Sequence, residues 1–368
     1  MSVRSRGVLL VIGCLGYMSA QAFAQQSNAG ETTKWEIEVH GGGVRVGDPT
    51  AATTVMPAPG EAFTTRNNRP SRYVSSWYFG DGATLLNQQL AAFTITPRAA
   101  RITPLDPVLT RAATRSSTTG TFGLRVGRRL SPRFTAELNV DYGPSPIELS
   151  ENALGDIEAS RTTFASVWSE SLGPGMPFQN AVVSSSSEIE EGTGGQIVAT
   201  GALTARLRRR GALVPYVTGG LGGVFNAGSD PSVTLRGNYS ALYILGEPFN
   251  FNGSDTVTVR WVRPDRALVG LVGGGFTYDL SRRNGFRVDL RLHVSSNAVD
   301  TDVSARPGVQ TDTPGRAIAS ATTPSVQTSS TASERSTLSG PAITAFRTRE
   351  SSGVHVDTAL TVGYFWRF

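Results

Sequence analysis

Apolar and polar residues alternate along the last fifteen positions of the chain, 354–368. The even-numbered positions are apolar or tolerable in an apolar setting, whereas most odd-numbered positions are polar or small. A period of two residues is that of a β-strand with one apolar and one polar face. Tyr364, Trp366 and Phe368 gather at one end, as in the aromatic band at the edge of a bilayer. The pattern predicts a membrane-spanning strand.

Seven further segments are strand-like. Their alternation is clear in 133–143 and 285–296, whereas 212–225 and 266–280 are apolar on both faces. A closed barrel leaves no backbone edge unpaired in lipid, so an even number of strands is expected. The sequence therefore predicts an all-β fold, a closed antiparallel transmembrane β-barrel of eight strands. The predicted strands are 34–46, 119–130, 133–143, 195–208, 212–225, 266–280, 285–296 and 354–368.

The connections between these segments alternate between long and short. Outer-membrane barrels have long extracellular loops and short periplasmic turns, so this order predicts both ends of the barrel on the periplasmic side. The long connections are 47–118, 144–194, 226–265 and 297–353, and the short ones are 131–132, 209–211 and 281–284.

Parts of the long connections carry predictions of their own. Residues 232–235 and 256–262 alternate and are expected to extend two barrel strands beyond the bilayer. Segment 297–353 is rich in Ser, Thr, Ala and Pro, which is typical of a mobile or disordered loop. A barrel of ten or twelve strands is the structural alternative, if segments such as 72–79 or 91–97 also cross the membrane.

The first 24 residues have the three parts of an export signal. Arg4 and Arg6 give a positive start, residues 8–18 form a short apolar stretch, and Ala22-Phe23-Ala24 is a small-x-small cleavage site. The apolar stretch is too short to cross a bilayer as a helix. We therefore expect residues 1–24 to be a signal peptide cleaved after Ala24, and residues 25–368 to form the exported barrel.

Composition supports this prediction and excludes some functions. Charged residues make up 17% of the chain, against about 25% in a typical soluble domain, and lipid-facing positions account for the deficit. Removal of the signal peptide would lower the formal net charge from +5 to +3, which is too small to indicate nucleic-acid binding. The single cysteine, Cys14, lies in the expected signal peptide, so the exported part has no disulfide framework or thiolate zinc site.

The last eight residues carry a further pattern. Thr361, Gly363, Trp366 and Phe368 match the sorting signal of bacterial outer-membrane barrels, which is a polar residue, a glycine two positions on, and aromatic residues third from last and last. With its strands and termini, the chain resembles small outer-membrane barrels of the opacity-protein and OmpA-transmembrane type, although its loops are much longer. The resemblance implies insertion into the bacterial outer membrane by the barrel-assembly machinery, contact with outer-membrane lipids and a surface role.

Charged residues of both signs fall on the predicted inward positions. An eight-stranded barrel is only just wide enough for side chains to fill it, and buried charges need partners. We therefore expect ion pairs that plug a structural lumen, and the alternative is a narrow gated pore opened by rearranging those pairs. The inward charged residues are Glu36, Glu38, Arg125, Arg129, Glu137, Asp141, Arg206, Arg287, Asp289, Arg291, Asp357 and Arg367.

All three histidines, His40, His293 and His355, also fall on inward positions near the predicted outer ends of their strands. The first strand must close against the last, so three imidazoles at one rim would suit a transition metal or a pH sensor. The simpler interpretation is that they line the lumen as ordinary histidines, and a register shift at Gly41-Gly42-Gly43 would separate them.

A short motif suggests one enzymatic alternative. His293-Val294-Ser295-Ser296-Asn297-Ala298 resembles the His-x-Ser-Asn-Ala stretch of outer-membrane lipid A deacylases, which implies a serine nucleophile and a histidine base. Here one residue is inserted before the asparagine, and the histidine is predicted to face the lumen rather than lipid. We therefore assign no catalytic residue.

The function that the sequence favours is structural or interactive. The expected protein is an outer-membrane barrel that displays large surface loops for adhesion, shielding or envelope integrity. A channel for small solutes or small hydrophobic molecules is the alternative, and a lipid A deacylase-like hydrolase is a distant one. No cofactor is expected, and the expected partners are outer-membrane lipids, the barrel-assembly machinery and a surface ligand, not nucleic acid.

Overall fold

The structure is a computed structural model. It describes residues 34–64, 70–91, 100–115, 118–145, 147–173, 178–208, 212–244, 248–311, 338 and 340–368. The expected signal peptide and the predicted turn 209–211 lie outside the described residues, as does most of segment 91–97.

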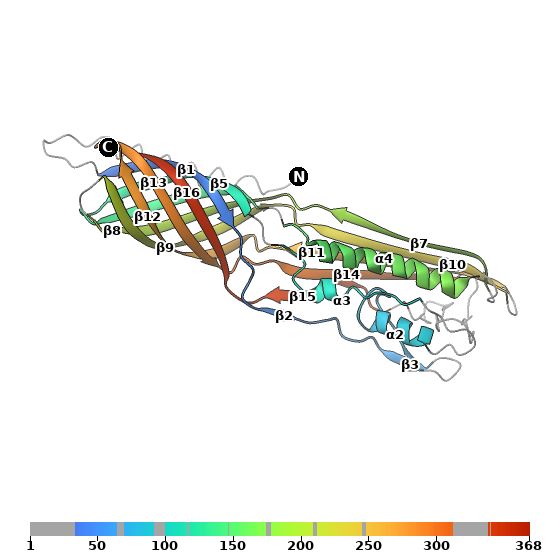
Figure 1. The fold of residues 1–368 in the computed structure, drawn as a ribbon. Coiled ribbons are helices and arrows are strands. Elements are labelled where there is room, and N and C mark those ends of the chain that lie inside the picture. The colour runs from blue at the N-terminus through green and yellow to red at the C-terminus, as the bar shows by residue number, and fades with distance from the viewer. Residues whose placement is uncertain are drawn as a thin grey trace.

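Eight antiparallel strands close into a barrel (Figure 1). In the order in which they pair around the barrel, they are β1 (Trp35–Arg45), β16 (His355–Arg367), β13 (Asn284–Ser295), β12 (Arg266–Asp279), β9 (Leu213–Gly228), β8 (Gly194–Arg206), β6 (Phe134–Pro144) and β5 (Thr118–Arg129). Short connections join β5 to β6, β8 to β9 and β12 to β13 at one end, which we call the turn end. The long connections leave from the opposite end, which we call the body end.

The predicted fold class is confirmed. Each of the eight predicted segments coincides with one barrel strand, and the ends differ by at most three residues. The alternative of ten or twelve strands is wrong where the structure describes it, because residues 73–79 are irregular and lead into a helix.

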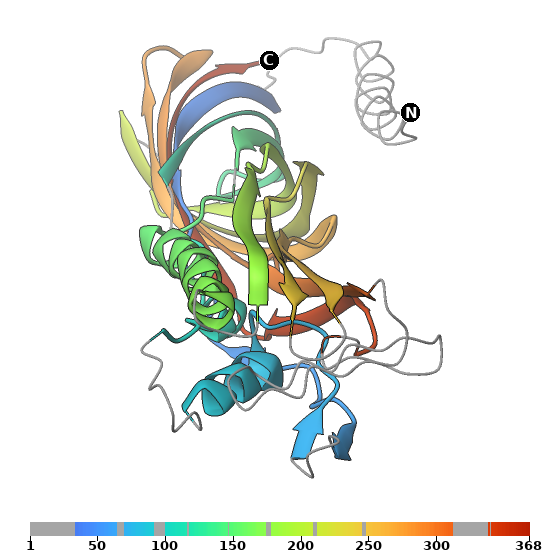
Figure 2. The same cartoon turned by 90° about the vertical axis from the view of Figure 1, so that its right-hand side faces the viewer.

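Six of the eight strands continue beyond the barrel into a second sheet (Figures 1 and 2). Its strands follow one another in the same order as the barrel strands to which they are joined. They are β2 (Ala52–Thr54), β15 (Ile343–Ser351), β14 (Asp300–Thr311), β11 (Phe249–Val262), β10 (Ser232–Tyr243) and β7 (Phe178–Glu190). The expected extension at 232–235 and 256–262 is confirmed, and it runs through the whole of β10 and β11.

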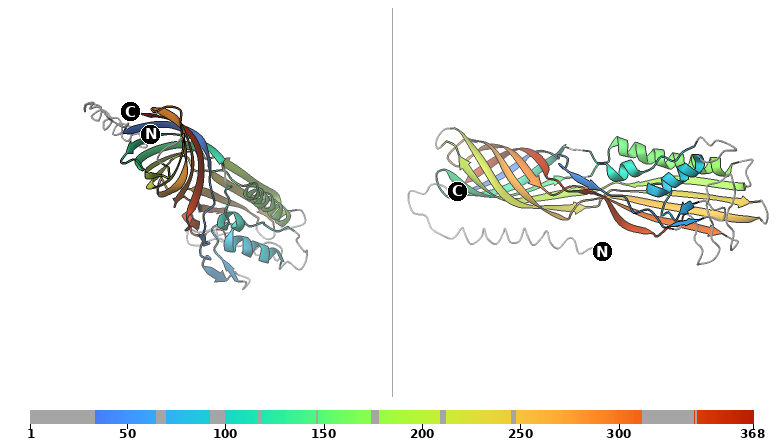
Figure 3. Two further views of the ribbon diagram at one scale, coloured as in Figure 1. Left: turned by 60° about the vertical axis from the view of Figure 1, so that its left-hand side comes forward. Right: turned by 90° about the horizontal axis from the view of Figure 1, so that it is seen from below.

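The strands β5 and β6 have no counterpart in the second sheet, and helices lie beside it instead (Figure 3). The remaining elements of this part are β3 (Ala62–Thr64), β4 (Pro70–Arg72), α2 (Gly80–Ala91), α3 (Asp106–Thr110) and α4 (Glu151–Leu172). Helix α4 follows β6, and the Ser150 side chain caps it by accepting a hydrogen bond from Ala153 N. None of the described helices combines the length and the hydropathy needed to cross a membrane.

The second sheet, β3, β4 and the three helices form one folded unit, which we call the outer body. Its core joins apolar side chains of α4 with those on one face of β10, β11 and β14. Phe164 and Trp168 of α4 pack on Tyr239 of β10, and the rings of Trp168 and Tyr239 stack at 3.7 Å. Apolar burial of this extent stabilises a domain of its own. The expectation of a mobile or disordered segment 297–353 is therefore wrong for the residues that form β14 and β15, because Val303 and Ala305 belong to this core.

One carboxyl group lies inside this core. Asp255 of β11 is fully buried, and its Oδ2 accepts hydrogen bonds from Trp77 N (2.6 Å) and Ser76 Oγ (3.0 Å). Its Oδ1 has no hydrogen-bond partner among the described residues. Burial raises the pKa of Asp255 to about 7. The carboxyl thus ties the segment before α2 to the sheet, and it keeps its proton under mildly acidic conditions.

We expect the outer body to lose stability as the pH rises from about 4 to about 7. An unfolded aspartate ionises near pH 4, whereas Asp255 in the folded chain ionises at about 7. Between these values the native state holds the extra proton, so the free energy of unfolding falls with pH, by on the order of 4 kcal/mol, and then levels off. The variant Asp255→Asn keeps an acceptor for Trp77 N and should lack this slope. Urea unfolding followed by tryptophan fluorescence at pH 4 to 8 measures it, and equal slopes for both proteins would contradict the assignment.

Candidate functional site

The barrel interior contains a network of ion pairs between buried side chains. Arg125 lies 2.7 Å from Asp289 and 3.1 Å from Glu38. Arg287 lies 3.0 Å from Glu137 and 3.1 Å from Glu38. These five side chains are almost completely buried. Each buried charge has a partner of opposite sign, as buried charges require, so paired side chains fill the lumen at this level.

The network extends toward the turn end through Glu36. This carboxylate contacts Arg287 and lies 2.9 Å from Nε of Arg367. Nη2 of Arg367 lies 2.9 Å from Asp279. The guanidinium of Arg367 also lies 4.4 Å from the ring centre of Phe365, within the range of a cation–π contact. Phe365 is fully buried, so an aromatic ring closes the lumen next to the ion pairs.

Tyr216 of β9 fills the space on the other side of the network. Its hydroxyl donates a hydrogen bond to Asp289, and the guanidinium of Arg287 lies 5.4 Å from its ring centre. An interior tyrosine needs such a partner for its hydroxyl group. Tyr216 and Phe365 therefore complete the plug together with the charged residues.

Glycines on neighbouring strands make room for the large side chains of the plug. Gly363 lies opposite Arg287 across the β13–β16 pair, and Gly275 lies opposite Asp289 across the β12–β13 pair. A Cβ atom on Gly363 would collide with the carboxylate of Glu38. These inward glycines are therefore required by the packing of the lumen.

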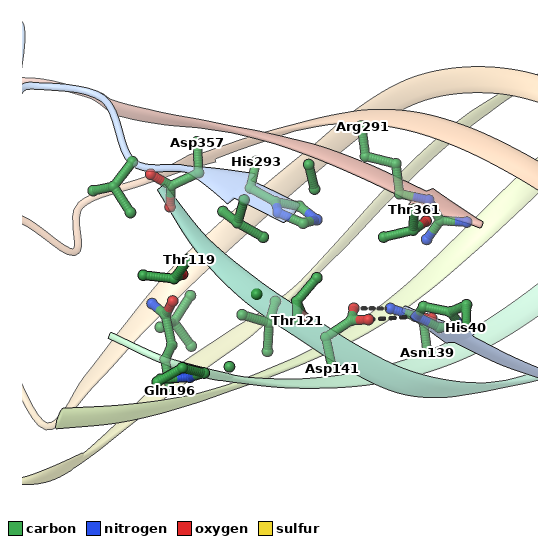
Figure 4. Close-up of a pocket in the computed structure, with 18 of the residues that line it drawn as sticks. His40, Thr119, Thr121, Asn139, Asp141, Gln196, Arg291, His293, Asp357 and Thr361 are labelled. Atoms are coloured by element: carbon green, nitrogen blue, oxygen red, sulfur yellow. Dashed lines mark hydrogen bonds and ion pairs between the residues drawn. The ribbon is translucent and has the colours of Figure 1, made fainter. Parts of the chain in front are cut away.

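A small cavity lies between the plug and the body end (Figure 4). Its volume is about 40 Å³, which is room for roughly three water molecules. On one side, His40 Nε2 lies 2.5 Å from Asp141, which also accepts a hydrogen bond from Asn139. On the other side is His293, whose Nε2 is buried without a hydrogen-bond partner in the described residues.

The three histidines do not meet. Across the β1–β16 pair His40 lies opposite Gly363, eight residues along β16 from His355. His355 lies 2.9 Å from Asp357, which is opposite His293 across the β13–β16 pair. In the part of the chain that the structure describes, no group of three or more His, Cys, Asp or Glu residues is arranged to hold a metal ion.

The remaining predicted site residues are placed as follows. Arg291 lies at the cavity, 3.5 Å from Glu137. Arg129 and Arg206 are half-buried near the turn end, within electrostatic reach of Glu36. Ser295 and His293 are buried on the inner face of β13, so the deacylase-like motif does not face outward. Of the residues matched to a sorting signal, Thr361 and Gly363 face inward, and Trp366 and Phe368 are exposed on the outer face.

Several residues that shape the lumen were not identified from the sequence. Phe365 follows the alternation of β16 and could have been placed inside, but it stands among aromatic residues expected to face lipid. Tyr216 and Asp279 lie on strands whose two faces are hard to separate because both are apolar or glycine-rich. Their place becomes visible only when the strand registers are known.

Comparison with known proteins gives limited similarity. No protein-family model and no curated protein matches the chain. Among solved structures, the outer membrane protein OprG from Pseudomonas aeruginosa is 11% identical with a TM-score of 0.33, covering 91% of this chain and 97% of that one. The COG4313 outer membrane channel from Pseudomonas putida F1 is 11% identical with a TM-score of 0.22, covering 93% and 100%. The P. putida toluene transporter TodX is 8% identical with a TM-score of 0.19, covering 92% and 91%. These superpositions are too loose to assign a function to this chain.

We expect an added methyl group in the lumen to be costly and one on the outer wall to be tolerated. A Cβ atom on Gly123 would lie 2.7 Å from His40 Nε2, whereas a Cβ atom on Gly120 of the same strand would meet nothing closer than 4.0 Å. Gly123→Ala should therefore lower the free energy of unfolding by about 1–3 kcal/mol, and Gly120→Ala should leave it nearly unchanged. Urea unfolding of the barrel in detergent measures both, and equal effects would contradict the packing role of Gly123.

Proposed function

We propose that the protein is inserted in the outer membrane, that its barrel serves as an anchor, and that its outer body makes the functional contacts at the cell surface. The observation that carries this proposal is a lumen plugged by paired charges beneath a folded unit with its own apolar core. A barrel built for passage needs an open path, whereas the interior of a barrel that only anchors can be filled by side chains.

The outer wall of the barrel supports membrane insertion. Lipid-facing leucines are 53–82% exposed on five of its strands, namely Leu124, Leu221, Leu268, Leu290 and Leu360. An apolar belt of this extent is unfavourable in water and matches the hydrocarbon layer. Trp35, Trp366 and Phe368 are exposed near the turn end, where they suit the interface between hydrocarbon and headgroups.

The surface of the outer body is of a different kind. The face of the second sheet that is turned away from the helices carries short polar or charged side chains, among them Asn238, Ser254, Thr258 and Arg306. Such a face suits water and excludes a lipid environment for this part. With the barrel in the outer membrane, the body end would face outward, as the long connections predict.

A small-solute channel is the second candidate. The observation that favours it is the cavity at the body end of the plug, where His293 Nε2 and Nη1 of Arg291 are buried without hydrogen-bond partners in the described residues. Polar groups of this kind bind water or a polar solute. Passage would then require the ion pairs beneath the cavity to rearrange.

Bilayer recordings separate these two functions. We expect no channel current from the wild-type protein, and none from Arg287→Ala. This variant removes the cation that faces Glu36, Glu38 and Glu137, so it should lower the free energy of unfolding by about 3–5 kcal/mol. A stable current that appears in Arg287→Ala and not in Arg129→Ala would favour the gated channel. An open porin in the same bilayers serves as the positive control.

Cysteine labelling of intact cells tests the orientation. The expected exported chain is free of cysteine, since Cys14 lies before Ala24. We expect a membrane-impermeant maleimide to label Ser254→Cys on the outer body of intact cells. Ser281→Cys, in a turn-end connection, should react only after the outer membrane is permeabilised. If Ser281→Cys alone reacted in intact cells, the orientation of the barrel would be opposite to the one proposed.

A further inference from the structure

The outer body contains a cavity that is separate from the barrel lumen. It lies at the N-terminal end of α2 and has a volume of about 360 Å³. Helix α2 lies in the part of the molecule far from the barrel (Figure 1). Three segments enclose it, namely 57–61, 73–81 and 341–346. Small-molecule sites have volumes of about 300–1,000 Å³ and are mostly apolar with a few polar groups. The cavity therefore has the size of a site for a small ligand or for one side chain of a partner.

Polar and apolar groups share its walls, and part of the wall is aromatic. Tyr73, Phe79, Ile343 and Phe346 line it, and the ring of Tyr73 stacks on Phe63 with ring centres 4.4 Å apart. Phe79 is buried, so its ring is held by the core of the outer body. Walls of this kind bind an apolar group, and aromatic faces also attract a cation.

Among the described residues that line the cavity, the two charged groups are both carboxylates. Asp81 stands in the first turn of α2 and accepts a hydrogen bond from Gly60 N at 2.9 Å through Oδ2. Glu61 is exposed and forms no ion pair with any residue that the structure describes. Two carboxylates beside aromatic walls give the cavity a negative potential.

Neighbouring groups do not make the cavity favour an anion over a cation. The positive end of the α2 dipole would attract an anion, but Gly80 N already donates a hydrogen bond to Asp106 Oδ2 at 3.0 Å. Arg72 lies beside the rim, where its Nη1 donates a hydrogen bond to the carbonyl oxygen of Gly60 at 3.2 Å. Arg72 is exposed, so solvent weakens its attraction to Glu61 and it competes only weakly with a bound cation.

We propose that this cavity binds a ligand with an apolar body and a cationic ammonium or guanidinium group. The apolar part would fill the space between Phe79 and Phe346, and the cation would lie near Glu61 and Asp81. The proposal concerns the outer body alone, so it holds whether or not the barrel conducts.

The test uses the purified full-length protein in lipid nanodiscs and three probes of similar shape. Benzyltrimethylammonium carries the cation, benzyl alcohol is neutral, and benzoate is an anion. Isothermal titration should show the ammonium probe binding at least about tenfold more tightly than benzyl alcohol and more tightly still than benzoate, because the two carboxylates attract the cation and repel the anion. Benzoate or benzyl alcohol binding as well as the cation, or no binding of any probe, would overturn the proposal.

Matched variants locate the site. Glu61→Gln should weaken binding of the ammonium probe about fivefold, and the Glu61 side chain is exposed, so the substitution should leave the fold intact. Glu188→Gln is the control, because Glu188 is an exposed carboxylate of the same body that pairs with Arg236 on β10. Equal affinities for wild type, Glu61→Gln and Glu188→Gln would place the probe elsewhere and overturn the assignment.

Discussion

Continuous pairing of backbone groups is the constraint on which the rest of the molecule depends. The eight strands close, so the N–H and C=O groups of each strand are paired on both sides, and closure fixes which strands are neighbours. The outer sheet then takes its strand order from the barrel, because six strands enter it from the barrel. Since β5 and β6 stop at the body end, the ring opens above them and exposes an apolar face. Helix α4, which β6 leads into, covers that face.

The parts that the sequence predicts well are those where the environment changes from one residue to the next. In β13, Val288 and Leu290 face outward while Arg287 and Asp289 face inward, and this contrast marks both the strand and its two faces. The partners within the lumen are a different matter. Gly363 lies opposite Arg287 because of the register between two strands that are far apart in the sequence. Alternation within one strand does not predict this register.

The outer body was missed for two physical reasons. Helix α4 carries Ile157, Phe164 and Trp168 at helical spacing, but the period-two strands around it led to the expectation of a loop. Strand β14 buries small side chains such as Ala305 on one face and presents polar ones on the other, so its composition is close to that of a disordered segment. Burial of Asp255 has no local signal at all, since it depends on the packing of a distant segment that donates Trp77 N.

The short junctions between the two sheets determine how firmly the outer body is held on the barrel. Five of the six strands pass from barrel to outer body through only three or four residues, as at 229–231 and 263–265. A domain on a flexible tether samples many orientations, whereas a body carried on several short connections keeps a fixed orientation relative to the barrel. The outer body is thus held in a fixed orientation on the barrel. A load applied to its far end would pull along the strands and reach the barrel wall without first straightening a linker.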